Sequence, residues 1–235
     1  MVRGMTQVAT PDIPNPQPVA SRLRSIELQG PAGRLEALLN EGAPNSPFAA
    51  LVCHPHPVGG GTMHNKVVYH AMKTLNAPEW GLQWPVLRFN FRGTGLSEGR
   101  HDGMAESGDV RAALAWLENA YHRPILLAGF SFGAAMSLKS LFEGGQARAL
   151  ALLGLPTQAE GRIYRYPYLA ECRIPKLFLS GDRDQFAPAP NFIQVAESAA
   201  APRHMALIAG ADHFFTGQLE RMQDALAGWL KELKP

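Results

Sequence analysis

The feature that most constrains the fold is a succession of short, continuous apolar runs separated by segments of helical periodicity. A strand with one face in water alternates apolar and polar residues, whereas a continuous apolar run is typical of a strand buried on both faces. Helical segments between such runs provide the crossovers that parallel strands need. The six runs are Phe48–Cys53, Val86–Phe91, Ile125–Gly129, Ala149–Leu153, Lys176–Ser180 and Met205–Ala209.

Two further strands are expected ahead of these runs. Arg22–Gln29 and Arg34–Asn40 flank the stretch Gly30-Pro31-Ala32-Gly33, where Gly and Pro supply the backbone dihedrals of a chain reversal. The fold class is therefore α/β. The sequence predicts an about eight-stranded, mostly parallel sheet with an antiparallel N-terminal hairpin and helices on both faces.

The domain organisation follows from composition. Of the 235 residues 46% are hydrophobic, which is enough for the core of one domain, assigned to residues 21–235. Residues 1–20 are rich in proline and aperiodic, so a flexible tail is expected there. The segment Gly154–Pro175 is too short for a large cap domain.

Charge and cysteine content exclude several classes of function. The formal net charge is +2 and no long basic run occurs, so a nucleic-acid partner is not expected. No apolar run approaches the roughly 18 residues that cross a bilayer, so no membrane partner is expected. Cys53 and Cys172 are the only cysteines, which favours free thiols in a reducing compartment and a cytoplasmic location.

A nucleophile motif follows the third apolar run. Gly129-Phe130-Ser131-Phe132-Gly133 matches Gly-x-Ser-x-Gly, preceded by a predicted strand and followed by a helix-forming Ala/Met/Leu stretch. A serine on a sharp strand-to-helix turn stands clear of the backbone, and the flanking glycines avoid collisions with neighbouring elements. The alternative, an ordinary glycine-rich turn, does not explain this setting as well. Ser131 is the predicted nucleophile.

A base and an acid follow in the order that this motif requires. His213 comes after the last predicted strand and Asp182 and Asp184 come after the preceding one, so all lie at the carboxyl edge of the sheet beside Ser131. Asp184 is favoured as the acid, because an Asp directly after Gly, such as Asp182, commonly shapes its own loop. Asp212 is expected to be structural.

The chain resembles a family of small, bacterial-type α/β-hydrolases. The resemblance rests on Cys-His-Pro-His-Pro at 53–57, Asn-Lys-Val-Val at 65–68, Arg-Phe-Asn-Phe-Arg-Gly at 88–93 and Gly-Phe-Ser-Phe-Gly at 129–133. It is similar in outline to dienelactone-hydrolase-like enzymes, which often carry a Cys nucleophile instead. The resemblance implies carboxylic ester hydrolysis. It also implies an oxyanion hole made of the backbone N–H groups of Phe132 and His56, since Pro55 and Pro57 have none.

Some of these residues could also belong to other kinds of site. His54, His56 and His64 are spaced closely enough to share a metal ion, but no cysteine or carboxylate clusters with them, so no metal and no cofactor are expected. The run Gly59–Lys66 lacks the Gly-Lys-Ser/Thr ending of a phosphate loop. Arg88 and Arg92 are expected to be structural donors. A thioesterase, an amidase or a non-catalytic binding protein on this fold is the alternative function.

The substrate is expected to be a small ester with a short acyl chain. Aromatic residues of the short segment 154–175 and of the loops that carry the acid and the base are predicted to form a compact apolar pocket. Phe186, Phe214 and Tyr164 are the candidate substrate-binding residues, with Tyr166, Tyr168 and Phe215 nearby. The expected partner is this small molecule, and the sequence leaves a homodimer open.

Overall fold

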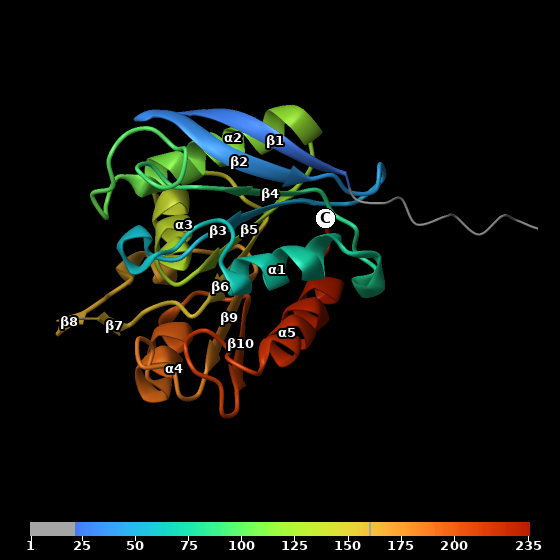
Figure 1. The fold of residues 1–235 in the computed structure, drawn as a ribbon. Coiled ribbons are helices and arrows are strands. Elements are labelled where there is room, and N and C mark those ends of the chain that lie inside the picture. Colours follow the sequence, from blue (N-terminus) through green and yellow to red (C-terminus); the bar gives the residue numbers. More distant parts are fainter. Residues whose placement is uncertain (1–21, 160) are drawn as a thin grey trace, which may run out of the picture.

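The computed structural model describes residues 22–159 and 161–235 (Figure 1). The predicted tail over residues 1–20 lies outside them. An eight-stranded sheet runs in the order β1-β2-β4-β3-β5-β6-β9-β10. Its strands are β1 (Leu23–Gly30), β2 (Gly33–Asn40), β3 (Ala49–Cys53), β4 (Val86–Phe89), β5 (Ile125–Phe130), β6 (Ala149–Leu153), β9 (Lys176–Gly181) and β10 (Arg203–Ile208).

The pairing confirms the predicted fold class. β1 pairs antiparallel with β2 through the turn at residues 31–32, β2 pairs antiparallel with β4, and all further pairs in the sheet are parallel. Each predicted apolar run is a strand of this sheet, with bounds shifted by two residues at most. The carboxyl ends of β3, β5, β9 and β10 therefore open on one edge.

Helices cover both faces of the sheet (Figure 1). α1 (Lys66–Asn76) and α5 (Leu219–Glu232) pack on one face, and α2 (Glu106–Tyr121), α3 (Phe132–Phe142) and α4 (Ala189–Ser198) pack on the other. Successive strand side chains alternate between the two cores: Leu51 belongs to the core under α2 and α3, and Val52 to the core under α1 and α5. This alternation is why the central strands β3, β5 and β6 are apolar along their length.

One pair of strands was not expected. β7 (Gln158–Ala159) and β8 (Arg162–Ile163) form a separate two-stranded sheet that projects from the body of the molecule (Figure 1). Strands of two residues are too short to show an alternating or continuous apolar pattern in the sequence. The hairpin and the 3-10 turn η3 (Pro167–Ala170) are the only regular structure described between β6 and β9, so no large cap is present among the described residues.

The segment after β4 is braced by a buried ion pair. The Arg92 guanidinium binds both carboxylate oxygens of Asp109, at 2.6 Å in the shorter contact, and the Arg92 backbone N–H binds the same carboxylate. Both side chains are buried, so each charge neutralises the other away from water. Arg88 donates to the carbonyl of Met63. These arginines are structural, as the sequence predicts.

No helix within 22–159 and 161–235 is long and apolar enough to cross a membrane. Cys53, at the end of β3, is fully buried and Cys172 is partly exposed, and both thiols are free. Burial raises the pKa of the Cys53 thiol to about 12, so it stays protonated at neutral pH.

The two thiols should therefore differ in reactivity. Iodoacetamide at about pH 8 is expected to alkylate Cys172 in the native protein and to leave Cys53 unmodified, because only an accessible thiolate reacts. Mass spectrometry of tryptic peptides gives the site. A Cys172→Ser variant should take up no label until guanidinium unfolds it. Native labelling of Cys53 at the rate of Cys172 would contradict the burial of β3.

Candidate active site

Ser131 occupies a strained turn between β5 and α3. Its backbone has φ 56° and ψ −119°, a conformation that few residues other than glycine adopt, and α3 begins at the next residue. The Ser131 N–H donates to the Leu153 carbonyl of β6 at 2.8 Å, which holds the turn against the sheet. The serine thus stands at the N-terminal end of a helix, at the edge where the parallel strands end.

Gly133 lets this turn sit against the neighbouring strand. A Cβ atom on Gly133 would lie 2.5 Å from the carbonyl oxygens of both Cys53 and His54, a distance that side chains do not tolerate. A Cβ on Gly129 would lie 2.4 Å from the Gly133 carbonyl oxygen. The two glycines of the motif are therefore required by contact between backbones, and they bring the first turn of α3 beside the loop that follows β3.

Three side chains form a continuous hydrogen-bonded chain. His213 Nε2 lies 2.9 Å from Ser131 Oγ, and His213 Nδ1 lies 2.8 Å from Asp184 Oδ2. Asp184 and His213 are each 2% exposed. A carboxylate can only accept, so Nδ1 carries the proton and Nε2 is left to accept the Ser131 hydroxyl proton.

The environment of Asp184 keeps it ionised. Burial alone would raise the pKa of this carboxyl, but hydrogen bonds from His213, from the Ser180 hydroxyl and from the Phe186 N–H outweigh burial, and the net shift is downward. The Ala187 N–H adds a fourth bond at 3.0 Å. At neutral pH the group is a carboxylate whose lone pairs are occupied by donors on every side.

The other two carboxylates of these loops have structural roles. Asp182 is exposed and accepts the N–H of Gly210 at 2.7 Å, which ties the loop after β9 to the end of β10. Asp212 accepts the N–H groups of Phe214 and Thr216 and so folds the loop that carries His213. Of the three carboxylates, Asp184 is the one in contact with the imidazole.

The loop after β3 contacts the start of α3 through His56. The ring of His56 packs edge-on against that of Phe132, with centroids 4.8 Å apart. The His56 carbonyl accepts the N–H groups of Gly59 and Gly61, which closes the loop on itself. The His56 side chain therefore lies against that of Phe132, the first residue of α3, where N–H groups lack partners within the helix.

His54 is a structural residue of the same loop. Its Nδ1 lies 2.7 Å from the Pro55 carbonyl and its Nε2 accepts the Phe91 N–H at 3.0 Å, so both ring nitrogens are engaged. Burial lowers the pKa of His54 to about 4, and the ring is neutral at pH 7. His64 is exposed and follows the loop. Among residues 22–159 and 161–235 no group of three metal-binding side chains comes together.

Sequence reasoning missed a second histidine–carboxylate pair near this loop. His101 Nδ1 lies 2.7 Å from Glu106 Oε1, and the His101 ring packs against the rings of His56 and Phe132. Glu106 is fully buried at the start of α2 and also accepts the N–H groups of Asp102 and Gly103. His101 lies in the loop before α2 and Glu106 is the first residue of that helix, and no local sequence motif marks this spacing of five residues.

The candidate substrate-binding residues divide into two groups. Phe186 and Phe214 both touch the imidazole of His213, with centroid distances of 4.7 and 5.2 Å. Tyr164 lies on the segment after β8 and is 38% exposed. The neighbouring aromatics serve packing: Tyr166 and Phe215 are buried in the two cores, and Tyr168 stacks on Phe142.

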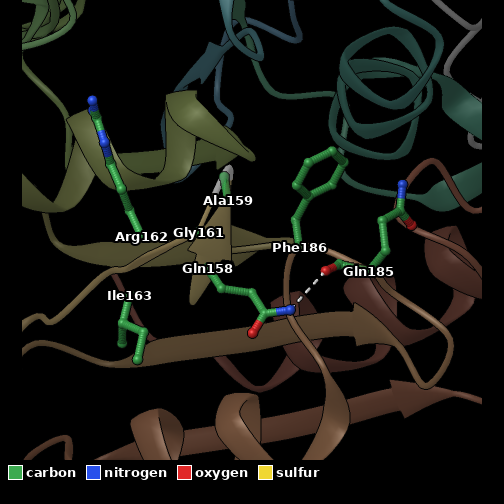
Figure 2. A pocket seen from close by; sticks show the side chains of 7 residues that line it. All are labelled: Gln158, Ala159, Gly161, Arg162, Ile163, Gln185 and Phe186. Carbon is green, nitrogen blue, oxygen red and sulfur yellow. Dashed lines mark hydrogen bonds between the residues drawn. The ribbon is translucent and has the colours of Figure 1, made fainter.

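A cavity of about 280 Å³ lies beside Phe186, between the β7–β8 hairpin and the loop after β9 (Figure 2). Phe186, Ile163 and Ala159 give it apolar walls, and Gln158, Gln185 and Arg162 give it polar ones. The expected wall of tyrosines is absent from its lining, because Tyr166 turns inward and donates its hydroxyl to the Pro156 carbonyl. The lining of this cavity is more polar than the apolar wall that the sequence predicted.

Comparisons with known proteins identify the family to which the chain is similar. The family model described as "Alpha/beta hydrolase domain" matches residues 49–229. An uncharacterized protein of Rickettsia prowazekii is 36% identical over 214 residues, which cover 87% of either chain.

Two solved structures are similar along most of the chain. An alpha-beta serine hydrolase homologue from Coxiella burnetii has 34% identity and a TM-score of 0.74, covering 87% of this chain and 96% of its own. A Xanthomonas campestris protein, described as an α/β serine hydrolase without a lid, has 28% identity and a TM-score of 0.76. That match covers 94% of this chain and all of the Xanthomonas one.

The close approach at Gly133 can be tested by adding one methyl group. Gly133→Ala should lower the free energy of unfolding by about 3 kcal/mol, because the backbone must move to relieve the overlap. Urea unfolding followed by circular dichroism measures it. Gly228→Ala is the matched control: its Cβ would meet open space on α5, so this variant should gain up to about 1 kcal/mol. Equal stability of the two variants would refute the close approach.

Proposed function

Since the chain belongs to the alpha/beta hydrolase domain family, we propose that it is a serine hydrolase that cleaves small carboxylic esters with short acyl chains. The observation that carries the proposal is the chain of hydrogen bonds from Asp184 through His213 to the Ser131 hydroxyl, at 2.8 and 2.9 Å. Similarity to the Coxiella and Xanthomonas proteins, which are described as serine hydrolases, supports the class of enzyme.

In the proposed reaction Ser131 Oγ attacks the acyl carbon while its proton passes to His213 Nε2. The imidazolium then protonates the departing alkoxide, and an acyl-enzyme remains. Water attacks this ester in turn, giving up a proton to His213, and Ser131 is released with the acid product. Asp184 fixes the Nδ1–H tautomer of His213 and stabilises the imidazolium without taking up its proton.

The oxyanion of each tetrahedral intermediate is proposed to bind two backbone N–H groups, those of Phe132 and His56. Phe132 is the first residue of α3, so its N–H points toward the end of the helix where the dipole favours negative charge. The 4.8 Å contact between the His56 and Phe132 rings supports the pairing of the two donors. Such donors do not need to reorganise during the reaction.

The size and lining of the cavity support a small substrate. Its volume of about 280 Å³ suits a short acyl or alcohol group, and the Phe186 and Phe214 rings beside His213 offer apolar contact. We propose these two residues, with Tyr164 at the rim, as substrate contacts. No metal or cofactor has a part in the proposed reaction, and a cytoplasmic location is proposed.

The principal test is the role of Ser131. The wild-type protein is expected to hydrolyse p-nitrophenyl acetate, to be much less active on long-chain esters such as p-nitrophenyl palmitate, and to form a covalent adduct with a fluorophosphonate. Ser131→Ala should lower kcat on the order of a million-fold and give no adduct, because no other group supplies the nucleophile. Ser198→Ala, at an exposed serine of α4, is the control and should retain full activity.

The outcomes separate the alternatives. A protein that binds ligands without turning them over would give neither product nor adduct in its wild-type form. Ester, thioester and amide of one acyl group, compared by kcat/KM, distinguish an esterase from a thioesterase or an amidase. Activity of Ser131→Ala near that of the wild type, with an unchanged melting temperature, would reject the mechanism.

A second test distinguishes the two neighbouring carboxylates. Asp184→Asn is expected to lower kcat by about 10⁴-fold, because the amide no longer holds His213 in the Nδ1–H tautomer. Asp182→Asn loses one surface hydrogen bond to Gly210 and should lower kcat by less than about threefold. Steady-state kinetics on p-nitrophenyl acetate give both values. The reverse ranking would transfer the acid role to Asp182.

A further inference from the structure

The cavity beside Phe186 is built from two segments that are joined to each other. The Phe186 carbonyl accepts the N–H groups of Thr157 and Gln158, at 2.8 and 3.0 Å, so the base of the β7–β8 hairpin is fastened to the loop after β9. The side chain of Gln158 also donates to the Gln185 carbonyl at 3.3 Å (Figure 2). The hairpin therefore forms a wall of the site.

Phe186 connects this cavity with the triad. Its ring lines the cavity and lies edge-on to the imidazole of His213, with centroids 4.7 Å apart. Asp184, two residues earlier, binds the other side of the same imidazole through Nδ1. A group of the substrate bound in this cavity would thus contact a residue that packs directly on the imidazole of His213.

The charge carried by the described residues of the cavity wall is positive. Arg162 of β8 is the charged residue of the lining, and among the described ranges 22–159 and 161–235 no carboxylate forms an ion pair with it. Arg162 and Phe186 extend to one side of the hairpin, while Gln158 and Ile163 extend to the other (Figure 2). The guanidinium is therefore on the side toward which Phe186 points.

We propose that this cavity binds a free carboxylate of the substrate through Arg162, so that the preferred substrates are short esters carrying a negative charge. A guanidinium offers paired donors to the two oxygens of a carboxylate. The inference rests on the proposed function. The carboxylate itself does not react, since water cleaves only the ester bond and yields an acid and an alcohol.

Matched esters test the preference and locate the charge. Methyl hydrogen succinate against methyl butyrate varies the charge on the acyl side, and acetoxyacetate against propyl acetate varies it on the alcohol side. Hydrolysis is followed as acid release at constant pH 7, where the added carboxylic acids are ionised. The wild-type enzyme should have the higher kcat/KM for the charged ester of at least one pair, and raising NaCl from about 0.02 M to about 0.5 M should reduce that preference.

The variant that removes the charge is Arg162→Gln. It should lower kcat/KM for the preferred charged ester roughly tenfold and change the neutral ester of that pair less than twofold, the size expected for loss of one charged hydrogen-bonded contact. Arg165→Gln is the matched control, because Arg165 is an exposed arginine three residues away that does not line the cavity. Arg162 is exposed, so its replacement should leave the melting temperature unchanged.

Two results would overturn the inference while the enzyme remains active: an equal effect of Arg162→Gln on charged and neutral esters, or an equal loss in Arg165→Gln. If no ester is cleaved and no fluorophosphonate adduct forms, the proposed function fails. Calorimetric titration with methyl hydrogen succinate and with acetoxyacetate then decides the inference separately. Binding of either ion that Arg162→Gln weakens roughly tenfold supports the site, and no binding of either, or unaltered affinity, rejects it.

Discussion

The candidate site depends on the close approach of two backbones, those of the β3 end and the first turn of α3. Gly133 has no room for a Cβ atom beneath the Cys53 and His54 carbonyls. This contact keeps the helix start against the loop that contains His56, while the Ser131 turn holds its unusual dihedrals through the bond to β6. The fold tolerates such a turn because the free-energy cost of one strained residue is small compared with the stabilisation from burying both faces of the sheet.

The two halves of the site differ in how they are fixed. Asp184 and His213 are almost fully buried, and the carboxylate has four donors, so their geometry is determined by strand ends and hydrogen bonds. The start of α3, where the oxyanion is proposed to bind, is held instead by ring packing of His56 against Phe132 and His101, with Glu106 bound to His101. Two carboxylate–imidazole pairs therefore flank the Ser131–Phe132 turn. His213, paired with Asp184, hydrogen-bonds to Ser131, whereas His101, paired with Glu106, packs against the Phe132 ring.

Hydrophobic periodicity and motif order were sufficient to predict the large sheet and the three side chains of the candidate site. Continuous apolar runs placed six of the eight strands of the large sheet, because strands buried on both faces have few polar positions, and the turn Gly30-Pro31-Ala32-Gly33 placed β1 and β2. The order serine, aspartate, histidine placed all three side chains at one edge. It could not predict β7 and β8, whose pairs Gln158–Ile163 and Ala159–Arg162 are too short for any periodicity. Nor could it tell that Tyr166 faces the core, because one aromatic residue in a loop fits a pocket wall and a core equally well.

These differences divide the molecule into a part that can carry the chemistry and a part that can select the substrate. The proposed nucleophile, acid and base, Ser131, Asp184 and His213, lie in the segments that directly follow β5, β9 and β10 of the large sheet. The β7–β8 hairpin lies outside the large sheet, and its base is hydrogen-bonded to the carbonyl of Phe186, whose ring contacts His213. Residues such as Arg162 and Ile163 are exposed and make few packing demands. Substrate preference can therefore change at the hairpin without cost to the fold, and this is why a motif can indicate the reaction yet leave the substrate open.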